Sequence, residues 1–252
     1  SPETSMEIQA TLGSDIAMAF DECPPYPCDR DYAAQSLALT TDWETRSRRW
    51  HADHAPSGQQ LFGIVQGSVF ADLREESAKS LVNLDFHGYA IGGVSVGEPE
   101  EEMLRAVENA IPFLPESKPR YAMGLGQPHQ LLEMISRGVD MFDCVLPTRA
   151  ARHGTAYTED GTINLKNKRF ERDDSPISAD THPLCRDFSR GYLRHLMTQG
   201  EHLGSRLLTL HNLHFYLNLM RRSRCAIRTA TFAEFRDQFV DRYCAGQASQ
   251  EA

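Results

Sequence analysis

The stretch LFGIVQGSVFADLREESAKSLVNLDFHGYAI, residues 61–91, decides the fold class. Its two ends, 61–65 and 89–91, are short apolar runs, and the charged stretch 70–83 between them carries apolar residues at helical spacing. A strand, a helix and a second strand in this order are typical of a parallel βαβ unit, whose buried strands are apolar on both faces. The stretch therefore predicts an α/β protein.

The same alternation extends along the chain in both directions. Further strands are predicted at 15–20, 120–123 and 139–145, and further helices at 31–54, 100–111 and 128–137. An open doubly wound sheet and a TIM barrel both fit this pattern. After Val145 the alternation stops, because Glu159-Asp160-Gly161 between alternating residues predicts a β-hairpin. Three helical patterns then close the chain, at 186–198, 201–222 and 231–244.

Composition narrows the class of protein. A chain of 252 residues that is 40% hydrophobic is long enough to bury a full core. No run approaches the roughly 18 apolar residues of a membrane helix, so we expect no membrane partner. The 6 cysteines are scattered and form no C-x-x-C pair, which favours free thiols in a reducing compartment. We therefore expect a soluble, cytoplasmic protein.

The net charge of -9 is unevenly divided. Residues 1–145 carry 23 acidic and 10 basic side chains, whereas residues 146–252 carry 12 acidic and 16 basic ones. The basic part includes Arg149 and Arg152 and suits a partner that bears phosphates, although solvated charges on helices and turns are the alternative. Net acidity therefore does not exclude a nucleic-acid partner.

Polar residues follow the predicted strands, where a parallel α/β fold builds its sites. Asp21 leaves the first apolar run, Gln66 the second and Gly93 the third. Asp143 lies within the last apolar run, where an unpaired buried carboxylate is costly. We expect Asp143 either to face a polar cavity as a nucleophile or general base, or to accept backbone N–H groups at a strand end.

Successive segments of the chain resemble the motifs of one enzyme family, the bacterial-type tRNA-guanine transglycosylases. In order they are SMEIQ (5–9), DIAMAFDEC (15–23), FGIVQG (62–67), AIGGVSVGE (90–98), PRYAMG (119–124) and GVDMFDCVLPTR (138–149). The resemblance continues through FSRGYL (188–193) and HNLHFYL (211–217). Because these segments are specific and span most of the chain, a chance match is negligible.

The resemblance implies both a fold and an activity. The fold is an irregular TIM (β/α)8 barrel forming one domain over 1–252, with a hairpin and an inserted zinc-type subdomain over about 150–212 and C-terminal helices. The activity is the exchange of guanine at the wobble position of tRNA anticodons for a 7-deazaguanine precursor of queuosine. Family members commonly form homodimers, so we also expect a homodimer.

The resemblance also assigns roles to residues of this chain. Asp143 matches the nucleophile that attacks ribose C1′ and forms a covalent RNA intermediate, as in the double displacement of retaining glycosidases. Asp21 matches the carboxylate that accepts hydrogen bonds from the purine N1–H and exocyclic amine. The remaining matches are Gln66, Gly93 and Val94 at the purine carbonyl edge, Met123 on the purine face, and Arg149 and Arg152 on the anticodon loop.

Two features depart from the family pattern. The family's barrel begins well before the point that matches Ser1, and that upstream part holds a general acid/base aspartate and an aromatic residue that stacks on the base. We therefore expect an N-terminally incomplete barrel, inactive and poorly stable by itself. The second departure concerns the family's C-x-C-x-x-C motif and later histidine, which bind zinc.

At the zinc motif this chain reads Asp180-Thr181-His182-Pro183-Leu184-Cys185, followed by His211. Asp180, His182, Cys185 and His211 are all acceptable zinc ligands, so a mixed zinc site is the expectation. The alternative is that the metal is lost, the loop is held by packing, and Cys185 is a buried thiol.

Two other functions compete with base exchange. One is a non-catalytic RNA-binding or scaffolding subunit of the same family, which predicts loss of the nucleophile and guanine-reading residues, yet Asp143, Asp21 and Gln66 are present. The other is a metal-dependent TIM-barrel hydrolase, which needs histidine and carboxylate ligands at several strand ends. Those ends carry almost no histidine, so the transferase interpretation is favoured.

Overall fold

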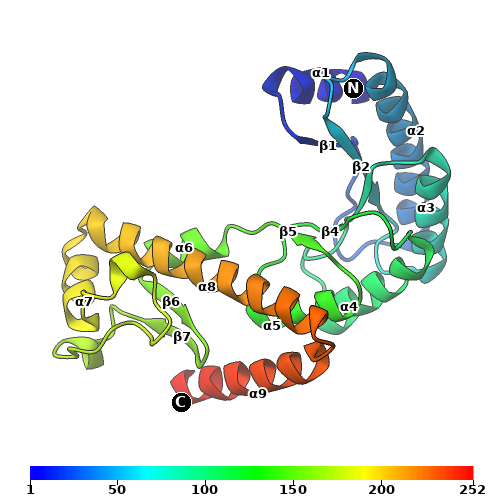
Figure 1. The fold of residues 1–252 in the computed structure, drawn as a ribbon. Coiled ribbons are helices and arrows are strands. Elements are labelled where there is room, and N and C mark those ends of the chain that lie inside the picture. Colours follow the sequence, from blue (N-terminus) through cyan, green and yellow to red (C-terminus); the bar gives the residue numbers. More distant parts are fainter. Residues whose placement is uncertain (252) are drawn as a thin grey trace. The chain divides into compact units, whose positions relative to one another are not determined.

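The computed structural model describes residues 1–251, which form two compact units (Figure 1). The first unit comprises Ser1–Leu125 and Met134–Asp143. The second comprises Gly126–Glu133 and the residues from Cys144 onward. Helix α5 (Pro128–Ser136) therefore contains a boundary between the units.

The first unit is built on a parallel sheet whose strands lie in sequence order. Its strands are β1 (Ile16–Met18), β2 (Gln60–Val65), β3 (Gly88–Ile91), β4 (Arg120–Ala122) and β5 (Met141–Phe142). A doubly wound sheet reverses its strand order at a switch point, whereas neighbouring parallel strands in sequence order are typical of a β/α barrel. The predicted α/β class is confirmed, and the strand order fits a TIM-like fold.

Helices alternate with these strands, as the sequence pattern predicts. They are α1 (Pro2–Leu12), α2 (Arg30–His54), α3 (Ala71–Leu84), α4 (Glu100–Glu108) and the short 3-10 helix η1 (Ile111–Phe113). The core of the unit buries Met6 of α1, Leu61 and Val65 of β2, and Leu81 of α3 in one cluster. Burial of apolar area from sheet and helices together stabilises the strand ends on which the site depends.

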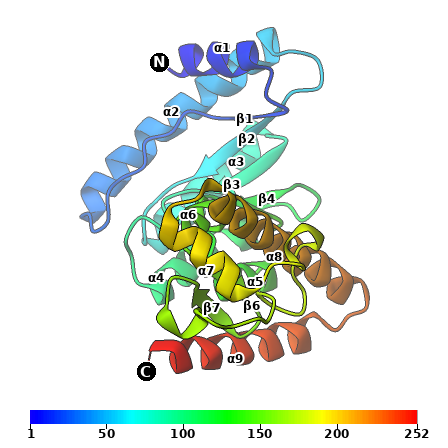
Figure 2. The ribbon, with the colours of Figure 1, turned by 90° about the vertical axis from the view of Figure 1, so that its left-hand side faces the viewer.

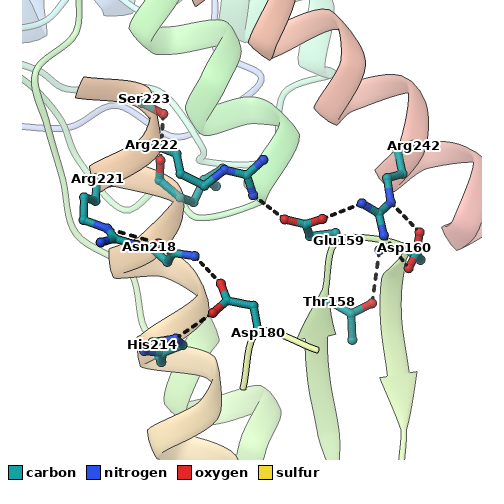
Figure 3. Close-up of polar contacts among 11 residues, drawn as sticks. Thr158, Glu159, Asp160, Asp180, His214, Asn218, Arg221, Arg222, Ser223 and Arg242 are labelled. Atoms are coloured by element: carbon teal, nitrogen blue, oxygen red, sulfur yellow. Dashed lines mark hydrogen bonds and ion pairs between the residues drawn. The ribbon is translucent and has the colours of Figure 1, made fainter. Parts of the chain in front are cut away.

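The second unit contains the predicted hairpin, made of β6 (Thr155–Thr158) and β7 (Gly161–Asn164). Glu159 and Asp160 form its turn, and Arg222 and Arg242 make ion pairs with these two acids (Figure 3). The other elements are α6 (Leu146–Arg152), η2 (Lys168–Phe170), η3 (Pro183–Cys185), α7 (Arg190–Gln199), α8 (His202–Arg228) and α9 (Phe232–Glu251).

Helix α9 lies along the hairpin (Figure 2). The side-chain oxygen of Gln247 accepts hydrogen bonds from the backbone N–H and the hydroxyl of Thr162, each at 3.0 Å. The C-terminal helix therefore secures a hairpin that by itself has only a two-stranded ladder, which is marginally stable in water.

The helices α1 and α6 are not predicted by the sequence pattern. Ser1 caps α1 through its side chain, and Gly13 ends it with a positive φ of 68°. Helix α6 has only 7 residues and begins directly after the apolar run 139–145. In the sequence its apolar residues therefore continue that run, and no separate helical periodicity is visible. In the described part of the chain, no helix is both long and apolar enough to cross a membrane.

Candidate active site

Most of the predicted base and catalytic residues lie at one edge of the first unit. Asp21 follows β1, Gln66 follows β2, Gly93 follows β3, Met123 follows β4 and Asp143 follows β5. Because the five strands are parallel neighbours, their carboxyl ends share that edge of the sheet. The fold therefore gathers residues that are up to 122 positions apart in the sequence.

Asp143 is exposed and lies just beyond a strand of only two residues. The expectation that it sits inside a buried apolar strand is wrong, because β5 ends at Phe142. Its Oδ1 accepts hydrogen bonds from the Tyr121 hydroxyl at 2.6 Å and from the Gly124 backbone N–H at 2.8 Å. The expected backbone contact at a strand end is therefore present, and the solvent-facing carboxylate is also accessible to a substrate.

Tyr121 is a site residue that sequence reasoning missed. It lies on β4 opposite Met141 of β5, and Met141 and Asp143 are two residues apart. Burial and the Asp143 carboxylate raise the pKa of Tyr121, so its hydroxyl stays protonated and donates. Only the register between β4 and β5 reveals this pair, because Tyr121 by itself resembles an ordinary strand residue.

Asp21 and Gln66 form a hydrogen-bonded pair. Gln66 is 1% exposed, and its Nε2 donates to Asp21 Oδ2 at 2.6 Å. Burial raises the pKa of Asp21, the hydrogen bond from Gln66 opposes that shift, and the Glu22 charge adds to it. Among the described residues, the buried Oε1 of Gln66 has no hydrogen-bond partner, which is the kind of group a ligand donor satisfies.

Gly93 approaches the Gln66 amide more closely than any other residue type would allow. Its φ is +60°, and a Cβ there would lie 2.7 Å from Gln66 Oε1. The neighbouring Val94 is buried, and Met123 is half-buried after β4. Gln66, Gly93, Val94 and Met123 thus follow β2, β3 and β4 at one edge of the sheet, and Gly93 packs against Gln66 beside Asp21.

Arg149 and Arg152 lie on α6 in the second unit. Both side chains are exposed and fall in the last turn of the helix, where positive charge is favourable because of the helix dipole. Their contact with an anticodon loop stays a prediction.

Glu44 is a second residue that sequence reasoning missed. This side chain on α2 is 2% exposed, and its Oε1 accepts the backbone N–H of Ile64 at 2.6 Å. Burial holds the pKa of Glu44 well above its usual range, and the Asp21 charge raises it further. The buried Glu44 carboxyl therefore lies close enough to Asp21 for the charge of Asp21 to affect its pKa.

Glu44→Gln is expected to stabilise the protein at neutral pH. A carboxyl with a raised pKa in the folded state contributes stability that is complete below its unfolded value of about 4.5 and is lost as the pH rises. Glutamine keeps an oxygen for the Ile64 N–H but does not ionise. We expect a melting temperature higher by on the order of 2–4 °C at pH 7.5 and little difference at pH 4.

The control for Glu44 is Glu7→Gln, which removes an exposed carboxylate from α1. Its melting temperature should follow that of the unaltered protein across the same pH range. Parallel pH profiles for Glu44→Gln and the unaltered protein would contradict the burial argument.

The residues at the family's zinc positions are engaged by other groups. His211 is fully buried, its Nε2 donates to the Tyr157 carbonyl at 2.8 Å, and its Nδ1 accepts from the Thr181 hydroxyl at 2.8 Å. Burial lowers the pKa of His211 to about 4, so the imidazole is neutral. Both ring nitrogens are therefore engaged by the protein, and a metal at Nδ1 would have to displace the Thr181 hydroxyl.

The other donors at these positions do not converge. The buried Cys185 thiol donates to the Leu207 carbonyl at 3.3 Å, and burial raises the pKa of Cys185, which disfavours the thiolate that binds zinc. Asp180 contacts His214 and Asn218 (Figure 3), and His182 Nδ1 accepts the Leu184 N–H. In residues 1–251 no group of three such side chains is placed to hold a metal. The arrangement does not fit the zinc site that the resemblance implies.

Metal content of the purified protein tests this mismatch. We expect zinc well below one ion per chain, because binding would break the hydrogen bond between Thr181 and His211 Nδ1 and require an unfavourable thiolate at Cys185. The double change Asp180→Cys and His182→Cys restores the family's thiolates and should raise the zinc content toward one per chain. The matched serine changes at the same positions should not, and stoichiometric zinc in the unaltered protein would overturn the expectation.

Comparison with known proteins shows the family of the chain. Residues 1–245 match the family model described as queuine tRNA-ribosyltransferase. The chain is 52% identical to the queuine tRNA-ribosyltransferase of Symbiobacterium thermophilum over a match of 252 residues in length, which covers 99% of this chain and 62% of that protein. It is 53% identical to those of Pelotomaculum thermopropionicum and Bacillus subtilis over 244 residues each, 96% of this chain and 65% and 64% of those proteins.

The chain thus spans less than two thirds of the length of these relatives. The family match nevertheless covers nearly every residue of the chain, including all five strand ends that carry the site. On this evidence the chain belongs to the queuine tRNA-ribosyltransferase family.

Proposed function

We propose that this protein exchanges guanine at the wobble position of tRNA anticodons for a 7-deazaguanine precursor of queuosine. The observation that carries the proposal is the exposed Asp143 carboxylate, held through one oxygen at the edge of the sheet that also presents the Asp21–Gln66 pair. A nucleophile and a guanine-selective carboxylate at one edge are what such an exchange requires.

Asp143 supplies the nucleophile in the first step. Both of its hydrogen bonds fall on Oδ1, and in the described part of the chain Oδ2 accepts none, so Oδ2 is the atom available for attack. Oδ2 bonds to ribose C1′ as the C1′–N9 bond breaks, and guanine leaves with that electron pair. The product is a covalent ester between Asp143 and the RNA, as in a retaining glycosidase.

The second step reverses the first with another base. N9 of the incoming 7-deazaguanine attacks C1′, the ester bond to Oδ2 breaks, and the Asp143 carboxylate is regenerated. The N9 proton of the incoming base passes to solvent, which supplies the proton that the departed guanine takes up. The Tyr121 hydroxyl and the Gly124 N–H keep the carboxylate oriented through both steps. The Asp143 carboxylate thus forms and breaks the bond to the reacting carbon, and the proton transfers at N9 are separate from it.

In the proposed reaction the base is selected by Asp21 after β1 and Gln66 after β2. An ionised Asp21 accepts two hydrogen bonds, from N1–H and from the exocyclic amine, which adenine cannot offer in that pattern. The Gln66 amide donates to Asp21 at 2.6 Å and also acts on the Cys23 thiol, and its buried Oε1 has no hydrogen-bond partner among the described residues, so it can turn an N–H to a purine carbonyl. The target nucleotide must leave its stack to reach these groups.

The remaining parts of the proposal concern partners. Arg149 and Arg152 present two positive charges that suit the phosphates of an anticodon loop. A homodimer is proposed from the family resemblance alone. Sedimentation at several protein concentrations tests the dimer, and the salt dependence of tRNA binding by Arg149→Ala and Arg152→Ala tests the contacts.

The test of the function is base exchange with labelled guanine and unmodified tRNA. Because the chain is shorter than its relatives, it is assayed alone and with the N-terminal portion of the Bacillus subtilis relative placed before Ser1. Incorporation of label that needs Asp143 in either form supports the proposal. Binding of tRNA without exchange in both forms favours a non-catalytic subunit, and binding of neither tRNA nor guanine overturns the proposal.

A further inference from the structure

Arg74 is a charged side chain buried without exposure in the first turns of α3. Burying an ionised group is costly unless its donors are satisfied. Each hydrogen bond that Arg74 makes goes to a backbone carbonyl: Nε to Ser68 at 2.6 Å, Nη1 to Gly92 at 2.8 Å and Nη2 to Gly93 at 3.1 Å. Its guanidinium therefore ties the loop after β2 to the loop after β3.

The two carbonyls after β3 belong to particular peptide groups. The Gly92 carbonyl shares its peptide bond with the Gly93 N–H, and the Gly93 carbonyl shares its peptide bond with the Val94 N–H. In a trans peptide the C=O and N–H point in opposite directions. A cation that fixes both oxygens on one side therefore directs both N–H groups to the other side and polarises them as donors.

Neighbouring contacts place the Gly93 N–H on the side of the base site. Burial raises the pKa of the Cys23 thiol, as does the charge of Asp21, whereas hydrogen bonds from the Gln66 side chain and the Gly93 backbone lower it. Asp21, Gln66 and the Gly93 amide therefore lie close together around the Cys23 thiol. A Cβ at Gly93 would lie 2.7 Å from Gln66 Oε1 and 3.3 Å from Arg74 Nη2, so the three groups are in close contact.

The far end of the same loop is held separately. The Glu98 carboxylate accepts the backbone N–H groups of Ser95 and Val96, the latter at 2.8 Å. Among the described residues, Arg74 donates to the carbonyls of Gly92 and Gly93, whereas Glu98 accepts N–H groups further along residues 92–98 and its charge also acts on Arg74. The buried guanidinium has a specific effect on two amides rather than a general effect on the loop.

We propose that Arg74 is a positioning residue for the carbonyl edge of the purine: its guanidinium holds the Gly92 and Gly93 carbonyls so that the Gly93 and Val94 N–H groups meet the purine oxygen. This rests on the proposed function, because it assumes that the strand-end site binds guanine. The ligand class is a purine with an oxygen at C6, and Arg74 contributes nothing to recognition of the 2-amino group, which falls to Asp21.

The test compares two bases that differ at that oxygen. Guanine carries the carbonyl, the N1–H and the 2-amino group, whereas 2-aminopurine keeps the 2-amino group but has no carbonyl and an unprotonated N1. Equilibrium dialysis of each labelled base against the 252-residue chain is carried out for the unaltered protein, Arg74→Lys and Asp21→Asn. Lysine keeps the positive charge but lacks the fork that reaches several carbonyls at once.

We expect Arg74→Lys to weaken guanine binding roughly 10-fold to 100-fold and to leave 2-aminopurine binding within about twofold. Asp21→Asn should weaken binding of guanine, whose N1–H and 2-amino group both donate to the carboxylate. Equal loss of both bases in Arg74→Lys, or no loss of either, would overturn the role of Arg74 alone. Failure of the unaltered protein to bind guanine would overturn the base site and the role of Arg74 together.

A measurement on the unaltered protein covers the case in which Arg74→Lys does not fold, as judged by circular dichroism. The guanidinium Nε–H resonance of Arg74 is followed by NMR as each base is added. We expect guanine to shift this resonance and 2-aminopurine to leave it unchanged. Identical responses to the two bases would overturn the proposal.

Discussion

Asp143→Asn is expected to abolish the covalent RNA intermediate and to lower the rate of base exchange by about four to six orders of magnitude, the loss seen when a nucleophile is removed. Asparagine retains an oxygen that accepts the Tyr121 and Gly124 hydrogen bonds, so the loop after β5 keeps its contacts. What is lost is the anionic oxygen that bonds to ribose C1′.

The measurement for Asp143 is denaturing electrophoresis of protein incubated with tRNA, together with the exchange rate. Tyr121→Phe serves as the matched control because it removes one hydrogen bond to the carboxylate and keeps the nucleophile. We expect that variant to retain the adduct at a rate lower by about 10-fold. An adduct of normal yield in Asp143→Asn would show that another residue attacks the ribose.

Asp21→Asn is expected to lower kcat/KM for guanine exchange by on the order of 100-fold to 1000-fold, because one of the two acceptors facing the purine becomes a donor. Gln66 Nε2, which donates to Asp21 at 2.6 Å, would keep an acceptor in the amide oxygen of the variant. The fold at the strand ends should therefore survive, and the loss should fall on recognition of N1–H and the 2-amino group.

The pH dependence of base binding provides a second signature of Asp21. Burial raises the pKa of this carboxyl, and only the ionised form accepts both hydrogen bonds from guanine. Affinity for guanine should therefore be complete above that pKa and fall as the pH drops through it, whereas Asp21→Asn should show a flat profile. A flat profile in the unaltered protein would contradict the role of Asp21.

Elements with strong local patterns are predictable from the sequence. The strands at 61–65 and 89–91 and the hairpin at Glu159-Asp160 are confirmed because apolar runs and turn residues act over a few positions. The environment of Asp143 is not predictable in this way, because β5 stops at Phe142 and the carboxylate finds its partners on β4. Strand register, rather than composition, decides that contact.

Arg74 and His211 show the same limit for buried polar groups. In the sequence Arg74 belongs to a run of charges that resembles a solvated helix face, and only the loops after β2 and β3 bury it. The spacing of Asp180, His182, Cys185 and His211 preserves a donor at each zinc position. What it does not reveal is that Tyr157 and Thr181 occupy both nitrogens of His211.

The one-sided anchoring of Asp143 has a consequence for the second half of the proposed reaction. Once Oδ2 is esterified, Oδ1 becomes the carbonyl oxygen of the ester, and the Tyr121 hydroxyl and Gly124 N–H then donate to that carbonyl. Two donors withdraw electron density from the ester and make the departing carboxylate less basic. The two contacts that orient the Asp143 carboxylate for attack thus also make it a better leaving group. The covalent ester between Asp143 and the RNA therefore breaks more readily in the second step.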